Sequence, residues 1–561
     1  MSEPVELGNI DGQLQLHDIQ GCAHQSPFAG RDVSELSGIV TGKVSNGFYM
    51  QDDGADDLFC TSEALFVFTR TFPDVLPGDR VLVSGMVDEY APGNFDNGNL
   101  TITQLIDPEI RVISRGNQLP VAIAIGTGGF DIPGRVIDDD GFSEFDPFND
   151  GIDFYESLES MLVRVESGVV VGPRNQYNEV VVIPEDRIVE NVASSAGALI
   201  LQEVDPNPER IMLNLNTENR EKIHVGARLV NSVTGILDYS YGNYKVNVFG
   251  IARFTVIEHE VSQASDRDKS LRVATYNVEN LSRFDESRIK QLAVDVNNLL
   301  NNPDILVLHE ILDDSGVEDD GVVSAEFTLT RLVELMKHKS GVSYNFVDNP
   351  PKNNRDGGVD GGNIRSVILF REDTIKITED RESGLSENPT RIGPDDWPFS
   401  VTRKPLVVIF DYKNSKIMVM ALHLTSRGAD TPLFGRDQPI NRPEEEKRVN
   451  QAAFIQDYLR KFHMRNPDVQ IIVAGDLNDD PWSKTLAELK GEILVDLGES
   501  LSENEKFTYI LDGNAIQLDY ILVSIDSNWK STLEIIHRNS IYDHTLQLTD
   551  HDPVVAEFLI P

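Results

Sequence analysis

The sequence has little cysteine and no long run of apolar residues. Its 561 residues include two cysteines, Cys22 and Cys60, which excludes a disulfide-framework protein and a four-cysteine zinc site. The two thiols can form one bridge in an oxidising compartment, or they can stay free and buried. A membrane helix needs roughly 18–20 apolar residues in succession. No such stretch occurs, so we expect neither a membrane span nor a membrane partner.

Basic residues are also scarce. The chain carries 49 Lys and Arg against 92 Asp and Glu, a formal net charge of −43 at pH 7. This charge excludes a histone-like basic binder and opposes the long-range approach of another polyanion. With 40% hydrophobic residues, the chain is expected to be globular rather than an acidic disordered protein. Its length predicts several domains, and we expect a monomer.

The first part of the chain is rich in β-branched residues, Gly and Asp. In 33–90, short strand-like runs are separated by turn residues, which predicts a small barrel or sandwich. The order of GIVT, GFYMQD, FVFT and GDRVLVSG resembles an OB-fold domain. Such barrels bind single strands through exposed aromatic residues, although alternating aromatics in a strand also fit a core. The aromatic candidates are Phe48, Tyr49, Phe66 and Phe68.

A second β-rich block follows. Its phrase VGARLVNSVTGILDY is similar to PGDRVLVSGMVDEY in the first block, which favours two barrels of similar build. We therefore expect OB-like domains over 1–118 and 119–260. The loop at 137–153, IDDDGFSEFDPFNDGID, offers many oxygen ligands and suits either structural Ca²⁺ or simple solvation. Two later acidic loops, 313–321 and 353–362, allow the same alternatives.

From residue 270 onward, apolar strand-like runs alternate with helical stretches at 286–301, 327–339 and 444–462, which predicts an α/β or α+β domain. Several of these strands end in acidic, amide or imidazole residues. Side chains at strand ends on one edge of a sheet can converge on one cleft. The segments are LRVATYNVENL (271–281), DILVLHEI (304–311), VMALHLTS (419–426), VAGDLND (473–479), LDYILVS (518–524) and LTDHDPV (548–554).

Together, in this order, these motifs resemble the endonuclease/exonuclease/phosphatase superfamily over about residues 268–560. The β-domains, GGVDGGNIRSVILFR and TPLFGRDQP make the resemblance closest to large extracellular bacterial nucleases. It implies two N-terminal OB-like barrels, a linker at 261–269, and an α+β four-layer sandwich over 270–561 in which helices flank two β-sheets. It also implies a secreted protein, although the opening MSEPVELGNI shows no export signal.

The resemblance further implies a divalent metal held by carboxylate and amide oxygens, which are the ligands that Mg²⁺ prefers. Glu310 is expected as the principal ligand, and Asn277 as a contact to metal or phosphate. Glu279 and Asp550 are expected to assist the ion, although a plain surface carboxylate is an equal interpretation of Glu279. We expect Mg²⁺ or Mn²⁺ at this site.

The same resemblance assigns the proton transfers. His551 matches the general base, and Asp519 matches the carboxylate that fixes the imidazole tautomer and stabilises its charged form. Asp476 is expected to orient or deprotonate the attacking water, and Asn478 to hold a phosphate oxygen. His423 matches the second family histidine, which is a general acid or a phosphate ligand.

Substrate phosphates are bound by cations. Arg365 and Arg403 are the preferred candidates, because they lie in the segments GGNIR and TRKPL that the resembling nucleases also show. Further cations near the motifs are Lys404, Arg427 and Arg436.

Three positions beside the motifs also matter. Gly475 in GDLND is expected to let the backbone turn tightly after its strand. His309 stands where the family usually has Gln, and Leu422 stands where many relatives have Asn. His309 is open to three interpretations: an added ligand, a shifted metal preference or a replaced hydrogen bond.

These assignments predict a divalent-metal-dependent nuclease of low sequence specificity that hydrolyses DNA, with RNA left open as a second substrate. A phosphatase or a phospholipid phosphodiesterase is the alternative within the superfamily. A non-catalytic nucleic-acid-binding or adhesion protein is the alternative of another class. It is disfavoured because each named catalytic position holds a chemically competent residue.

Overall fold

The computed structural model describes residues 14–56, 58–93, 95–188, 193–265, 270–379, 383–525 and 529–560. The chain divides into two compact units. The first comprises Met1–Val189, Leu201–Val256 and Asp430–Asn441, and the second comprises Glu190–Ile200, Ile257–Ala429 and Arg442–Pro561. Residues 1–13, and 266–269 of the expected linker, lie outside the described residues.

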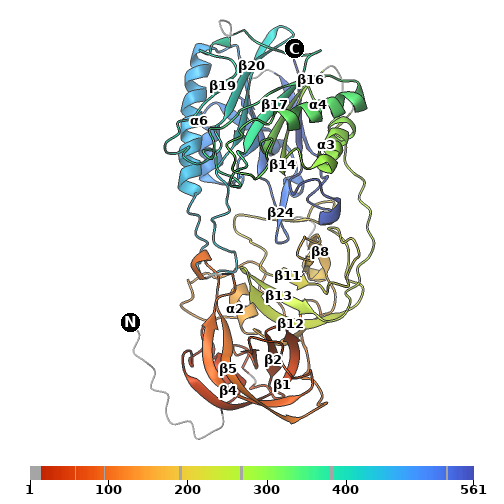
Figure 1. The fold of residues 1–561 in the computed structure, drawn as a ribbon, viewed down its shortest axis with the longest axis vertical. Coiled ribbons are helices and arrows are strands. Elements are labelled where there is room, and N and C mark those ends of the chain that lie inside the picture. The colour runs from red at the N-terminus through yellow and green to blue at the C-terminus, as the bar shows by residue number, and fades with distance from the viewer. Residues whose placement is uncertain are drawn as a thin grey trace. The chain divides into compact units, whose positions relative to one another are not determined.

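The first unit contains a closed five-stranded barrel in the order β1-β2-β3-β5-β4 (Figure 1). A short helix, α1 (Leu16–Gln20), precedes it. Alternate residues of the strands face inward, so the core holds Val40, Phe48 and Val83. A barrel is thus present, and its OB-fold identity stays a prediction. The strands are β1 (Asp32–Val44), β2 (Gly47–Gln51), β3 (Ala64–Phe68), β4 (Arg80–Tyr90) and β5 (Ile102–Ser114).

The aromatic residues considered as a stacking surface divide between core and cavity. Phe48 is fully buried in the barrel core, whereas Tyr49, Phe66 and Phe68 line a cavity of about 640 Å³ in the first unit. The Tyr49 hydroxyl donates a hydrogen bond to Oδ2 of Asp238 at 2.7 Å. The wall of this cavity therefore combines aromatic side chains with the carboxylate of Asp238.

The two cysteines are paired. Cys22 and Cys60 form a disulfide with a Cα–Cα distance of 5.0 Å. Of the two alternatives that the sequence allowed, the structure contains the bridge. It links the segment after α1 to the loop between β2 and β3.

The second β-rich block differs from the expected second barrel. Its strands form an open seven-stranded sheet in the order β6-β7-β12-β13-β11-β9-β8. The repeated phrase falls on β4 in the first block and on β12 in the second, but β12 pairs with β7 and β13, and β13 pairs in parallel with β11. Similar strand sequences therefore enter different sheets. The elements are β6 (Ile123–Ile125), α2 (Gly151–Glu156), β7 (Leu162–Val165), β8 (Val169–Gly172), β9 (Glu179–Ile183), β11 (Ile211–Asn214), β12 (Val233–Ser240) and β13 (Asn243–Val248).

The second unit contains two large sheets and their helices. The six-stranded sheet has the order β16-β17-β15-β14-β28-β27, and the seven-stranded sheet has the order β18-β20-β21-β22-β26-β23 with β19 beside β20. The elements of the first are β14 (Leu271–Leu281), β15 (Ile305–Ile311), β16 (Tyr344–Val347), β17 (Arg365–Arg371), β27 (Lys530–Ile535) and β28 (Val554–Leu559). Those of the second are β18 (Lys376–Ile377), β19 (Thr390–Arg391), β20 (Leu406–Tyr412), β21 (Ser415–His423), β22 (Gln470–Asp476), β23 (Leu494–Asp496) and β26 (Asp519–Ser524).

Helices α3 (Glu286–Asn298) and α4 (Glu326–Ser340) flank one side of these sheets, and α6 (Glu445–Arg465) flanks the other (Figure 1). They match the predicted helical stretches to within a few residues. A shorter helix, α7 (Lys484–Lys490), packs with α6, and a small third sheet contains β10 (Leu199–Ile200), β24 (Tyr509–Leu511) and β25 (Asn514–Ile516).

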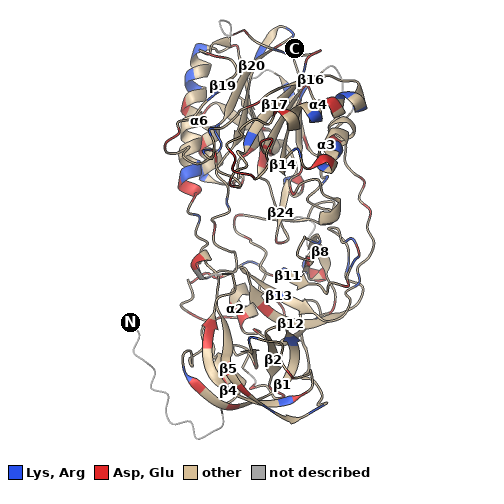
Figure 2. Cartoon of the chain, in the orientation of Figure 1, with Lys and Arg blue, Asp and Glu red and all other residues tan. Residues whose placement is uncertain are grey.

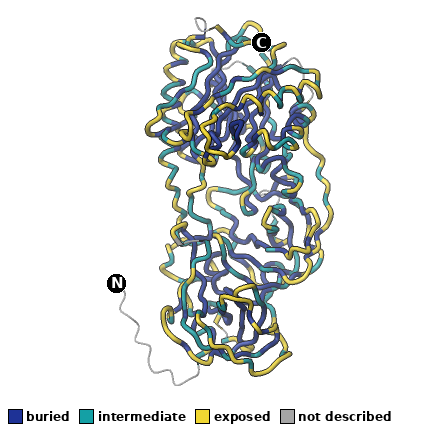
Figure 3. Tube along the Cα trace, in the orientation of Figure 1, coloured by how far each residue is buried: buried dark blue, intermediate teal, exposed yellow. Residues whose placement is uncertain are grey.

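Strand alternation explains the four layers. Val273 and Ile305 face the opposing sheet, whereas Ala274 and Leu306 pack against α3 and α4. A third core lies between the other sheet and α6 with α7. The strands form the buried interior in Figure 3. The predicted sandwich of two sheets flanked by helices is therefore present.

Charge is mixed along the surface elements. Figure 2 shows Lys and Arg interspersed with Asp and Glu, for example along α6. None of the helices in the described part of the chain is long and apolar enough to cross a membrane.

Candidate active site

Strand register aligns several predicted site residues. His423 at the end of β21 is in register with Asp476 at the end of β22, which is in register with Asp519 at the start of β26. In the facing sheet, Asn277 of β14 is in register with His309 of β15. Residues in register on neighbouring strands point to the same face of a sheet. The motifs therefore meet at one edge of the sandwich.

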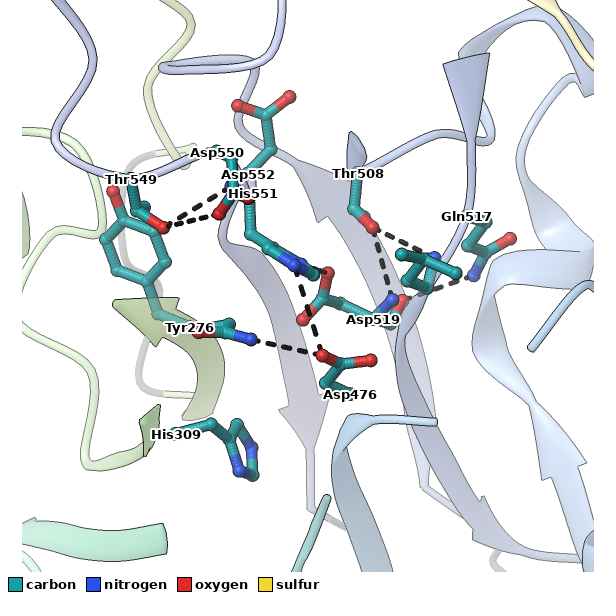
Figure 4. Close-up of polar contacts among 12 residues, drawn as sticks. Tyr276, His309, Asp476, Thr508, Gln517, Asp519, Thr549, Asp550, His551 and Asp552 are labelled. Atoms are coloured by element: carbon teal, nitrogen blue, oxygen red, sulfur yellow. Dashed lines mark hydrogen bonds and ion pairs between the residues drawn. The ribbon is translucent and has the colours of Figure 1, made fainter. Parts of the chain in front are cut away.

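His551 lies between two aspartates (Figure 4). Its Nδ1 is 2.7 Å from Oδ2 of Asp519, and its Nε2 is 4.0 Å from Oδ2 of Asp476. All three residues are buried. The Nδ1–H group therefore donates to Asp519, and Nε2 is the nitrogen on the side of Asp476.

Asn277 ties Asp476 to Glu310. Its Nδ2 donates to Oδ2 of Asp476 at 3.1 Å and to Oε1 of Glu310 at 3.2 Å. Glu310 has a φ of 63°, at the point where the pairing of β14 and β15 shifts register. Its other oxygen accepts a hydrogen bond from the Asn280 backbone N–H at 3.1 Å. Positive φ is uncommon for a non-glycine residue, so the surrounding structure holds Glu310 in this conformation.

Carboxylates crowd this site. Burial, together with the charge of Asp519, raises the pKa of Asp476 above its usual value. Partial burial and the charge of Asp550 raise the pKa of Glu279 to about 7. Burial disfavours the imidazolium form of His551, but Asp519, Asp550 and Asp476 outweigh it, so the pKa of His551 lies well above 6.5.

Residues 274–551 match the model of the Endonuclease/Exonuclease/phosphatase family. These residues form a domain of that family. Members are generally hydrolases of phosphodiester bonds, and they include nucleases and phosphatases. Residues 112–252 match a second family, described as a Domain of unknown function (DUF8508). A search of curated protein sequences finds no match.

Three solved structures are similar to the Endonuclease/Exonuclease/phosphatase domain. Humanized D. rerio TDP2 is 19% identical, and the match covers 52% of this chain and 100% of that one with a TM-score of 0.36. The human Nocturnin catalytic domain with bound sulfate is 17% identical, with 53% and 97% covered and a TM-score of 0.36. An endonuclease/exonuclease/phosphatase from Bacteroides vulgatus is 15% identical, with 52% and 100% covered and a TM-score of 0.36.

The donor set of this family domain fits a divalent cation. Glu310, Asp476 and the amide oxygen of Asn277 are hard oxygen ligands of the kind that Mg²⁺ and Mn²⁺ take. Burial, and then neighbouring carboxylates, raise the pKa values of Asp476 and Glu279. Asp476, Asp519 and His551 also place ligand atoms within 4.8 Å of one another. Because Asp519 already binds His551, Glu310 and Asp476 are the better ligands.

The two other histidines of the site, His309 and His423, are neutral. His309 is fully buried, with Nε2 3.1 Å from the Thr275 hydroxyl and Nδ1 2.8 Å from the Ser366 hydroxyl. Burial lowers its pKa to about 3, so His309 is a hydrogen-bonded core residue. His423 lies with Nε2 3.5 Å from Oδ2 of Asp476, and burial lowers its pKa well below 6.5.

Three further predicted residues lie beside the cluster. The Asn478 backbone N–H donates to Oδ1 of Asp476 at 2.8 Å, at a φ of 52°. Arg403 is buried and donates to the carbonyl of Leu424, and its charge acts on Glu310 and Asp476. Asp550 is partly exposed, accepts from the Thr549 hydroxyl at 3.2 Å and acts on His551 through its charge.

Arg365 is engaged elsewhere. It is buried, and its guanidinium donates to Val323 O at 2.6 Å, to Asp348 Oδ2 at 3.0 Å and to Asn363 O. These contacts fasten loops rather than leave donors for phosphate. Lys404 pairs with Asp356, Arg427 pairs with Asp480, and Arg436 belongs to the first unit.

Sequence reasoning missed residues that hold His551. Asn539 donates from Nδ2 to the His551 carbonyl at 2.6 Å. Asp552 accepts from the Asn539 backbone N–H at 2.7 Å and lies 3.0 Å from Nδ1 of His537. The Tyr509 ring lies 4.9 Å from the His551 ring. The position of Asp552 beside His551 in LTDHDPV was the available signal, and none pointed to Asn539 or Tyr509.

Gly475 does not make the expected turn. It lies within β22 with a φ of 157°. An added Cβ would lie 1.8 Å from the Leu422 carbonyl oxygen and 2.9 Å from Cε1 of His309. The prediction was wrong because close packing against β21 and His309, rather than a turn, requires glycine here.

Proposed function

We propose that the domain of residues 274–551 is a divalent-metal-dependent nuclease that hydrolyses DNA with low sequence specificity, and that RNA is a second substrate. The observation that carries the proposal is the continuous set of contacts from Asp519 through His551, Asp476 and Asn277 to Glu310. It joins a proton-transferring pair to a metal-binding carboxylate in one site. Phosphodiester hydrolysis needs both.

His551 is the proposed general base. Asp519 accepts from Nδ1–H and fixes the tautomer in which Nε2 takes the proton. Asp476, 4.0 Å from that nitrogen, is placed to orient a water molecule beside it. Glu310, Asp476 and Asn277 would hold magnesium or manganese, which would neutralise phosphate charge. The positive charge of the metal would also disfavour the imidazolium form of His551 and so lower its raised pKa.

The remaining residues are proposed to hold the substrate phosphate. A neutral His423 can donate a hydrogen bond from Nε2, and its low pKa makes it a poor general acid at neutral pH. Arg403 contributes positive charge toward the same cluster. Contacts of this kind recognise the backbone and not the bases, which supports low sequence specificity.

We further propose a secreted protein and the domain order 1–118, 119–260 and 270–561. The disulfide supports secretion, because such bonds persist in oxidising compartments. The closed barrel with the order β1-β2-β3-β5-β4 supports an OB-like assignment of the first domain. Under this proposal the β-domains guide the strand or act as spacers.

The test is hydrolysis by the full chain. Supercoiled plasmid, single-stranded RNA, a phosphomonoester and a phospholipid diester are each incubated with Mg²⁺, Mn²⁺ or chelator. We expect plasmid nicking with either metal and none with chelator. Intact plasmid beside cleaved lipid or monoester would replace the nuclease proposal by the alternative activity.

A variant excludes a contaminating nuclease. His551→Ala is expected to lower turnover at least about 100-fold, the scale of general acid–base catalysis. His338→Ala is the matched control, because His338 is an exposed histidine of α4. Equal turnover in His551→Ala, with circular dichroism unchanged, would contradict the general-base role.

A further inference from the structure

The first unit contains a second group of carboxylates, in the loop that leads into α2 (Figure 1). Asp138, Asp140 and Asp150 each offer a carboxylate oxygen, and these atoms lie within 4.8 Å of one another. The group falls in the acidic loop at 137–153. Acidic side chains alone do not make a site, so the surroundings of each carboxylate decide what this group can do.

Asp150 is a covered carboxylate without a hydrogen-bond donor. The residue is 3% exposed. Aspartate at the position before a helix normally accepts a hydrogen bond from the first turn. At α2 that bond is absent, and no other group in the described part of the chain donates to the Asp150 carboxylate. Asp150 therefore places an unpartnered and nearly covered carboxylate beside two others, an arrangement whose charge a cation would neutralise.

The other two carboxylates are held in place by backbone amides. Asp138 accepts from the N–H groups of Gly141 at 2.6 Å and Phe142 at 3.0 Å. Asp140 accepts from Ser143 and Glu144, both at 2.9 Å. Each carboxylate oxygen has a second lone pair that these bonds leave available. The loop therefore presents oriented oxygens without neutralising their charge.

A fourth carboxylate close to this group is Asp153, in the first turn of α2. Asp153 itself is committed to other partners, since Oδ1 lies 2.6 Å from Nε2 of His24 and Oδ2 accepts from the Asp146 N–H at 2.6 Å. It contributes charge to the group while its own oxygens are occupied.

We propose that Asp138, Asp140 and Asp150 bind one Ca²⁺ ion. Three carboxylates supply up to six oxygens, and Ca²⁺ accepts six to eight oxygen ligands in flexible geometry. Mg²⁺ requires near-ideal octahedral geometry and releases its waters reluctantly, which suits an irregular loop less well. The ion would join the turn at 138–140 to the start of α2. Its role is therefore to stabilise the first unit, and the inference does not rest on the proposed nuclease activity.

The test measures thermal unfolding and calcium binding of the full chain. In wild type, Ca²⁺ at about 100 times its Kd is expected to raise the Tm of the first unit by about 5 °C or more relative to chelator, and Mg²⁺ at the same concentration by less. Asp150→Asn is expected to lose that rise, and calorimetric titration is expected to show one Ca²⁺ fewer. Glu144→Gln, an exposed carboxylate of the same loop, is the matched control and is expected to behave as wild type.

The direction of the change in melting temperature distinguishes a metal ligand from an aspartate with a purely structural role. In chelator, Asp150→Asn is expected to melt at a higher temperature than wild type, because it removes an uncompensated charge. With Ca²⁺ the order reverses. An unchanged calcium response in Asp150→Asn, or loss of the response in Glu144→Gln, would overturn the proposal. Asp140→Asn repeats the test at an exposed ligand if Asp150→Asn does not fold.

Discussion

Oδ2 of Asp519 lies 2.7 Å from Nδ1 of His551, and Asp519 is fully buried. The carboxylate comes from the start of β26, whereas the histidine precedes β28 in the other large sheet. The contact therefore connects the two sheets at the edge where the site lies. It also decides which imidazole nitrogen is available for chemistry.

Asp519→Asn tests this relationship. The amide removes the negative charge that favours the imidazolium, so the pKa of His551 is expected to fall. A general base with a lower pKa stays deprotonated at lower pH, so the acid limb of the pH–rate profile is expected to move to lower pH while maximal turnover decreases. Histidine NMR titration measures the pKa directly. An unmoved profile would show that Asp519 does not act through His551.

Glu310→Gln tests the principal metal ligand. Loss of one carboxylate charge is expected to weaken Mn²⁺ binding at this site at least about 10-fold. Even residues that only support a metal ligand typically contribute about 10- to 100-fold to metal affinity. Glu334→Gln is the comparison, because Glu334 is an exposed carboxylate of α4 in the same unit. Manganese titration by electron paramagnetic resonance measures both. Equal affinity in Glu310→Gln and wild type would exclude Glu310 as a ligand.

Gly475→Ala tests the close packing inside β22. The added methyl group would overlap the Leu422 carbonyl oxygen at 1.8 Å, and overpacking of this kind costs about 1–3 kcal/mol or more. Gly428→Ala is the control in the same unit, because the nearest atom to its added Cβ is Ser426 Oγ at 3.6 Å. Urea unfolding measures the difference. A Gly475→Ala protein as stable as the control would contradict the close approach of β21 and β22 at this position.

His537 gives the fold a pH dependence. Burial opposes its charge, but Asp552 and Glu505 raise the pKa of His537 to about 9. A pKa above the unfolded value of 6.5 means that this stabilisation is complete below pH 6.5 and is lost as the pH rises to about 9. His537→Gln is therefore expected to cost about 1–3 kcal/mol at pH 6 and much less at pH 9.5. Urea unfolding at the two pH values measures this. A cost that is the same at both would show that the charge of His537 is not involved.

The site could be predicted because its residues end strands. Asn277, Glu310, His423, Asp476 and Asp519 each terminate or begin an apolar run, and parallel or paired strands bring such ends to one edge. The place of each residue at the end of a strand therefore predicts where its side chain lies in the folded domain. The three helices could be predicted for a similar reason, since each is a periodic segment of adequate length.

Other features depend on side-chain direction and on distant loops. Arg365 begins β17 near the motifs, but its guanidinium turns to Val323 and Asp348, a choice that sequence proximity does not encode. Asn539 reaches His551 from a loop after β27. The second β-rich block repeated a strand pattern, and a pattern does not specify which strand it will pair with.

The division of the chain into two units determines which truncated forms of the protein can fold. The backbone passes between the units at 189/190, 200/201, 256/257, 429/430 and 441/442. A fragment that ends near residue 260 therefore lacks Asp430–Asn441, including Phe434, whose carbonyl accepts from the Tyr239 hydroxyl and whose ring packs on Tyr155. Such a fragment should expose aromatic surface and aggregate. Neither unit is one continuous stretch of chain, so a single cut at the linker separates neither of them whole.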